Sequence, residues 1–131
     1  HARHHLHTYY IVRNADLVGF TDHEIELIAQ IARYHRKSEP KLQHGAFAAL
    51  SEADQHAVRM LSAILRIAIG LDRTHDGRTT SVSVSQKNKS LQIALYGKKR
   101  ADLDLNVYAT QQRVALLADV FECNVTVAIA N

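Results

Sequence analysis

The sequence predicts an α+β fold in which helices come first and a small β-β-(β)-α-β module follows. Apolar residues recur at helical spacing up to about residue 75, whereas from Thr80 they alternate with polar residues as in strands. The chain has 131 residues, of which 47% are hydrophobic and 22% charged, so it can bury a core of ordinary domain size. We therefore predict a helical region over residues 1–75 and a small α+β subdomain over residues 76–131.

The first helix is expected over residues 3–18, with Gly19 placed to end it in a left-handed cap. Thr21 should begin the second helix, because Thr21-Asp22-His23-Glu24 fits the capping box, in which a hydroxyl and a carboxylate each satisfy a backbone N–H. Ser38-Glu39-Pro40 should break that helix.

The third and longest helix is expected from Ser51 to about Arg73. Its apolar residues occupy much of the circumference, which predicts packing on more than one side. The loop at His75-Asp76-Gly77-Arg78 is the expected joint to the second region.

The second region begins with a predicted hairpin over 80–85 and 91–95, with a polar turn at 86–89 and one face buried. The alternation of apolar residues over 103–107 predicts another short strand. A helix over 110–121 and a last strand over 125–129 complete the predicted module.

Charge and cysteine content narrow the function. The net charge of +3 and nine histidines favour anionic partners. Cys123 is the sole cysteine, which excludes an intramolecular disulfide and suggests a small buried apolar residue. The sequence shows no long apolar span or signal peptide, so a cytoplasmic protein is expected, and its abrupt start suggests a fragment of a longer chain.

Basic residues gather at the end of the second helix, where Arg33, His35, Arg36 and Lys37 follow one another closely. One interpretation is an anion-binding corner with His35 as a titratable member. The alternative is structural, because cations at a helix C-terminus are stabilised by the helix dipole, typically by about 0.3–1 kcal/mol each.

A second set of cations lies along the longest predicted helix. Arg59, Arg66 and Arg73 are each seven residues apart, so they should form one stripe that can hold successive phosphates. For the stripe taken alone, a solvated face, or an ion pair from Arg66 to a carboxylate on a neighbouring helix, is the favoured explanation. Lys98-Lys99-Arg100 is read as a loop that aids solubility.

A metal site is the weaker alternative for the histidines near the start. His4 and His7 are three residues apart and could share an ion, but no further ligand follows at the required spacing. The sequence also lacks a nucleophile elbow, a P-loop and a dinucleotide fingerprint. We interpret His75-Asp76 as a coincidental pair within the joint.

Several segments together resemble the C-terminal, HD-like helical region of the exopolyphosphatase/guanosine pentaphosphate phosphatase (Ppx/GppA) family. They cover roughly residues 3–75 and are Arg3-His4-His5 to Tyr10, Leu17-Val18-Gly19-Phe20-Thr21, Ile31-Ala32-Arg33-Tyr34-His35-Arg36-Lys37, and Leu65-Arg66-Ile67-Ala68 with Leu71-Asp72-Arg73.

The resemblance implies an HD-like helical part and a parent enzyme that removes terminal phosphates from polyphosphate or guanosine pentaphosphate. Its Mg²⁺-dependent catalytic domain would precede this chain, which alone would be inactive and without a cofactor. The family's region contributes to a homodimer and a basic channel, which implies channel roles for Arg33, Arg36, Lys37, Arg66 and Arg73, and possible ones for His35 and Arg59. Where HD phosphohydrolases have a metal-binding Asp after Ala, this sequence has Ala68-Ile69.

Three functional hypotheses follow, of which the leading one is electrostatic capture of a polyphosphate chain. A divalent-metal phosphohydrolase using His4, His5, His7 and His35 is the enzymatic alternative, and a plain dimerisation module is the structural one. Nucleic acid is a less favoured partner, because only 6% of the residues are aromatic.

Overall fold

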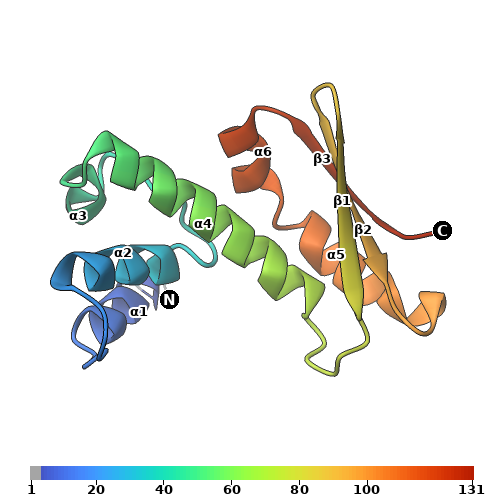
Figure 1. Cartoon of the computed structure of the whole chain (residues 1–131), viewed down its shortest axis with the longest axis horizontal. Helices are drawn as coiled ribbons and strands as arrows, with labels where there is room; N and C mark the ends of the chain where they lie inside the picture. Colours follow the sequence, from blue (N-terminus) through green and yellow to red (C-terminus); the bar gives the residue numbers. More distant parts are fainter. Residues whose placement is uncertain (1–3) are drawn as a thin grey trace. The chain divides into compact units, whose positions relative to one another are not determined.

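The structure is a computed structural model that describes residues 4–131, with side chains from Leu6 onward. It contains two compact units, residues 1–62 and 63–131, whose boundary falls within the longest helix, α4 (Glu52–Leu71). Helices come first and a three-stranded sheet with further helices follows, which confirms the predicted α+β fold (Figure 1).

The first unit contains α1 (His4–Arg13), α2 (Asp22–Arg33), α3 (Gly45–Ala48) and the beginning of α4. α1 ends at Arg13, earlier than predicted, and just beyond it the Asn14 side chain donates a hydrogen bond of 2.8 Å to the carbonyl of Tyr10. Gly19 has a positive φ of 94° but lies in the loop after α1 rather than at the helix end.

The start of α2 confirms the predicted capping box. The backbone N–H of Glu24 donates to the Thr21 hydroxyl at 3.1 Å, and the N–H of Thr21 donates to the Glu24 carboxylate at 2.8 Å. α2 ends at Arg33, ahead of Pro40. The core of this unit consists of Tyr34, Phe47 and Val58, with Leu27, Ile31 and Leu50 packed against them.

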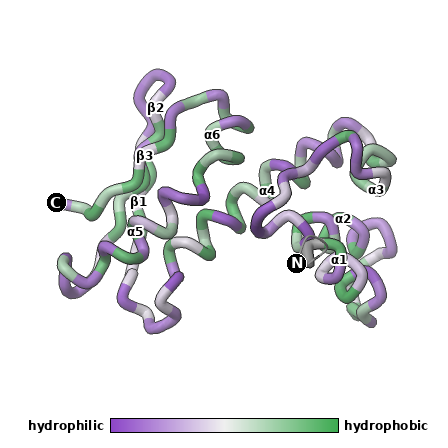
Figure 2. Tube along the Cα trace, turned by 180° about the vertical axis from the view of Figure 1, so that it is seen from behind, coloured by the Kyte–Doolittle hydropathy of each residue, from purple (hydrophilic) through white to green (hydrophobic). Residues whose placement is uncertain are grey.

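The second unit contains a sheet of β1 (Ser81–Lys87), β2 (Ser90–Tyr96) and β3 (Asn124–Ile129), in the order β1-β2-β3. β1 and β2 form the predicted antiparallel hairpin, and β3 is the predicted last strand and runs parallel to β2. β2 holds the buried positions, whereas β1 is exposed throughout, so the predicted buried face is absent from β1. Hydrophilic residues gather at the hairpin turn (Figure 2).

The strand predicted over 103–107 is wrong, because this segment forms the 3-10 helix η1 (Arg100–Leu103) and α5 (Asp104–Gln111). Leu103 is 1% exposed and Leu105 54%, yet Val107 is half-buried, so the three do not share one buried face as alternating strand residues would. The helix predicted over 110–121 is also divided, since α5 ends at Gln111 and α6 (Ala115–Phe121) begins after a turn.

The core of the second unit joins the end of α4 to the sheet, α5 and α6. α4 and α5 approach closely at Gly70, where an added Cβ would lie 2.6 Å from the Cα of Thr110. The segment between α4 and β1 is a loop, and Asn106 anchors it by donating hydrogen bonds to the hydroxyls of Thr74 and Thr79. The buried core residues are Ala63, Ile67, Ile93, Leu95, Leu103, Leu116, Leu117 and Val125.

Candidate phosphate-binding site

Four of the predicted site residues, Arg33, His35, Arg36 and Lys37, lie together at the end of α2 in the first unit, and we call this set the basic corner. Because all four come from one short segment, local backbone geometry decides which of their side chains face solvent.

Arg33 forms the inner part of the basic corner, since it is only 4% exposed. Its guanidinium carbon lies 4.9 Å from the centroid of the Tyr34 ring, at cation–π distance. Tyr34 is fully buried, packs edge-to-face on Phe47, and has its hydroxyl 2.6 Å from Nδ1 of His44. Burial raises the pKa of Tyr34 to about 12, while the charge of Arg33 acts in the opposite direction. Arg33 therefore packs in the interior beneath the exposed residues of the basic corner and does not itself face solvent.

The His35 ring is held by the backbone of the preceding helix turn. Its Nδ1 lies 2.6 Å from the carbonyl oxygen of Ala32, and because a carbonyl can only accept, Nδ1 carries the proton. In the neutral ring Nε2 is then the acceptor, and protonation would turn it into a second donor.

Arg36 and Lys37 form the outer part of the basic corner, because both are exposed. Lys37 has a φ of 60°, in the left-handed region, so the chain turns sharply at this position. Among the described residues no carboxylate pairs with Arg36, whereas Lys37 has a further contact within the chain. Arg36 is thus the residue of the basic corner that is best placed to bind an anion.

The arginines predicted along the longest helix have different environments. Arg59 and Arg66 keep their seven-residue spacing within α4, but Arg73 lies in the turn beyond its end at Leu71. Arg66 is 8% exposed, and both Arg59 and Arg66 have contacts within the chain. Arg73 is exposed. The regular stripe is therefore limited to two residues, of which Arg66 offers little surface.

The metal alternative involves His4, whose side chain lies outside the described residues, and His7, which is exposed. Within the described part of the chain, no three His, Cys, Asp or Glu side chains gather as metal ligands. The donors for a Mg²⁺ ion are therefore not assembled in this part of the chain.

His75-Asp76 has a structural role. The Asp76 carboxylate accepts hydrogen bonds from Arg78 at 2.6 Å and from the Thr74 hydroxyl at 2.8 Å. The hydrogen bond from Arg78 holds the pKa of Asp76 well below its usual range. These bonds hold the loop between α4 and β1 together.

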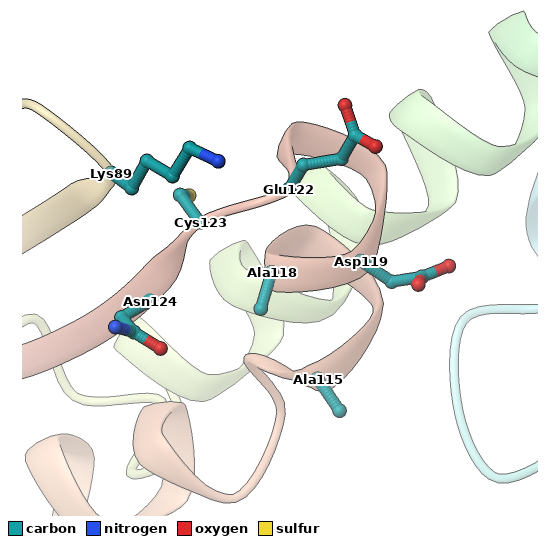
Figure 3. Close-up of a pocket in the computed structure, with 7 residues that line it drawn as sticks. All are labelled: Lys89, Ala115, Ala118, Asp119, Glu122, Cys123 and Asn124. Atoms are coloured by element: carbon teal, nitrogen blue, oxygen red, sulfur yellow. The ribbon is translucent and has the colours of Figure 1, made fainter.

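The sequence did not predict an open pocket of about 510 Å³ in the second unit, at the end of α6 (Figure 3). Figure 3 shows Lys89 reaching toward Cys123, with Glu122 on the adjoining turn. Glu122 has a φ of 51°, a conformation that favours glycine, so the sequence gives no signal of this turn. The pocket is a poor anion site, because the carboxylates of Asp119 and Glu122 outnumber the one lysine in its lining. Its residues are Lys89, Ala115, Ala118, Asp119, Glu122, Cys123 and Asn124.

Fold and site together define an α+β domain with an exposed cationic corner. Residues 1–115 match the family described as Ppx/GppA phosphatase, domain III, and the chain therefore belongs to the Ppx/GppA phosphatase family. The match confirms the resemblance and extends it through α5. A comparison with curated proteins found no match. No helix in the described part of the chain is long and apolar enough to cross a membrane.

Proposed function

We propose that this domain III holds a polyphosphate chain, or the phosphates of guanosine pentaphosphate, for a catalytic domain elsewhere in the parent phosphatase. That catalytic domain would use Mg²⁺ to cleave the terminal phosphate, and the chain alone would be inactive. The observation that carries the proposal is the exposed pair Arg36 and Lys37 beside His35.

Within this proposal, we give the binding residues different roles according to how exposed each one is. Arg36, Lys37 and Arg73 are exposed and would contact phosphate oxygens directly. Arg33 and Arg66, at 4% and 8% exposed, would act through the field of their charges and the packing of their neighbours.

The helix dipole acts against this site, because the C-terminal end of α2 carries a partial negative charge of about half an elementary charge. Two exposed cations outweigh that partial charge, so an anion is still attracted. If the cations only stabilise the helix end, however, polyphosphate will not bind. A binding measurement therefore separates the two interpretations.

The test is a titration of the chain with long-chain polyphosphate at low salt and at about 0.15 M salt. We expect the affinity to fall steeply with salt, because binding releases counterions. The Arg36→Ala/Lys37→Ala variant should lose about tenfold in affinity, which corresponds to about 1.4 kcal/mol.

The matched control is Lys98→Ala/Lys99→Ala, which removes the same formal charge from an exposed loop of the second unit. It should keep most of the affinity, and single-stranded DNA should compete poorly. Salt-independent affinity, or equal losses in the two double variants, would contradict the proposal.

A second candidate role is dimerisation of the parent enzyme. The specific observation in its favour is β1, an edge strand whose valines Val82 and Val84 are 37% and 61% exposed.

A further inference from the structure

We propose that β1 pairs with β1 of a second copy of this chain, antiparallel and about a two-fold axis at Ser83, so that two three-stranded sheets become one continuous sheet. The inference rests on the dimerisation role proposed above and is independent of phosphate binding.

β1 has an open and unprotected edge. It lies at the outside of the sheet, and its pairing with β2 is regular from Ser81 to Lys87, without a bulge. The strand contains no proline, and its one charged residue, Lys87, is the last. Bulges, prolines and charges are the usual devices that prevent edge strands from pairing with other chains. Their absence leaves the outward N–H and C=O groups of β1 available.

The sequence of β1 favours a second copy over an unrelated partner. Residues 81–85 read Ser-Val-Ser-Val-Ser, which is the same in both directions. A two-fold interface requires a surface that is complementary to itself. An antiparallel pair centred on Ser83 places Val82 opposite the second copy's Val84, and Ser81 opposite its Ser85. Across residues 81–85, valine then faces valine and serine faces serine.

The faces of the sheet also agree with this arrangement. Val82 pairs with Leu95 and Val84 with Ile93, so both valines point to the same face as two buried core residues. Leu95 and Ile93 are 0% and 3% exposed, whereas the valines are 37% and 61% exposed. A second β1 would place two more valines beside them and reduce that exposure.

Charge does not oppose the pairing. When the same register is continued outward from Ser83, Lys87 lies opposite Thr79 of the second copy. The two Lys87 side chains are therefore not opposite each other. Like charges facing each other across a strand pair would be destabilising, and this register avoids them.

Disulfide trapping tests the register directly. In a Cys123→Ala background, Ser83→Cys puts two thiols opposite each other at the axis, within the Cα separation that a disulfide requires. Ser83 pairs with Ala94, so its side chain lies on the sheet face opposite to Val82 and Val84. The matched control is Ser81→Cys, whose two copies would lie about 13 Å apart along the strands and cannot bridge.

We expect Ser83→Cys to form a covalent dimer under mild oxidation and Ser81→Cys to remain uncrosslinked, with circular dichroism checking that both fold. Val84→Lys should weaken self-association at least tenfold in sedimentation equilibrium. Equal crosslinking of both cysteine variants would overturn the inference. If the protein dimerises, but Ser83→Cys does not trap the dimer and Val84→Lys does not weaken it, the β1 pairing is overturned and the dimerisation role remains. If the protein is a monomer at all concentrations, both the β1 pairing and the dimerisation role are overturned.

Discussion

The hydroxyl of Tyr34 lies 2.6 Å from Nδ1 of His44, and the two rings stack at 5.6 Å between centroids. Tyr34 is the residue that ends α2, and it is fully buried. The segment that carries Arg36 and Lys37 therefore starts from a point fixed by packing and by a hydrogen bond. The packing and the hydrogen bond of Tyr34 therefore hold in place the segment that carries the proposed binding residues.

Replacing Tyr34 with phenylalanine should lower the free energy of unfolding by about 1 kcal/mol, because the ring stays while the hydrogen bond to His44 is lost. Denaturant unfolding measures this. Tyr108→Phe is the matched control, since Tyr108 is 63% exposed, and its change should stay within about 0.5 kcal/mol. Equal effects in the two variants would show that the Tyr34 hydroxyl adds no stability.

Alkaline pH should destabilise the first unit through two tyrosines. Burial raises the pKa of Tyr34 to about 12, and burial together with the hydrogen bond to Glu26 does the same for Tyr9. An unfolded phenol titrates near pH 10, so between about pH 10 and 12 the folded state binds more protons. The contribution of the two tyrosines to the free energy of unfolding is fully present below about pH 10 and falls as the pH rises toward 12.

Urea unfolding at a series of alkaline pH values measures this decrease. In the Tyr34→Phe and Tyr9→Phe variants, the free energy of unfolding should each time fall less steeply with pH. A stability that is constant across the same range, or that rises, would contradict the assigned cause.

Gly70→Ala should destabilise the second unit by about 1–3 kcal/mol, because its Cβ would lie 2.6 Å from the backbone of Thr110 and force α4 and α5 apart. The matched control is Gly45→Ala at the start of α3, where nothing lies within 4 Å of an added Cβ. That change should be neutral or stabilising, by up to about 1 kcal/mol. Thermal unfolding followed by circular dichroism compares the two, and a tolerated Gly70→Ala would refute the close approach.

Thr21→Ala should cost about 1 kcal/mol by removing the cap of α2. Thr21→Ser keeps the hydroxyl that accepts from Glu24 and should retain most of the stability. Hydrogen exchange of the first amides of α2 gives a local measurement. If serine and alanine destabilise equally, the lost methyl group rather than the cap is responsible.

The sequence predicted those elements whose signals are local. The capping box at Thr21, the long helix and the hairpin all depend on residues close in sequence, and all are present. The segment 103–107 was mistaken because three apolar residues at alternate positions suit a strand, although Asp102 and Asp104 also favour helix starts. The parallel pairing of β3 with β2 joins distant segments, so no local pattern reveals it.

For the site, the sequence predicted where cations gather but not which of them face solvent. Arg33 and Arg36 are the same residue type in the same basic segment, yet Arg33 is buried beside the Tyr34 ring and Arg36 is exposed. The difference depends on α2 ending at Arg33, before the predicted break at Ser38-Glu39-Pro40, and on the left-handed backbone of Lys37, which the sequence does not signal.

The parallel pairing of β2 with β3 also bears on how the chain folds. Ser90 is opposite Asn124, so this part of the sheet forms only after a loop that contains η1, α5 and α6 has closed. Contacts between distant segments slow folding, because the entropy of closure must be lost before they form. We expect helix signals to appear before the native sheet in stopped-flow refolding, and the central strand to remain open on one side until the last strand arrives.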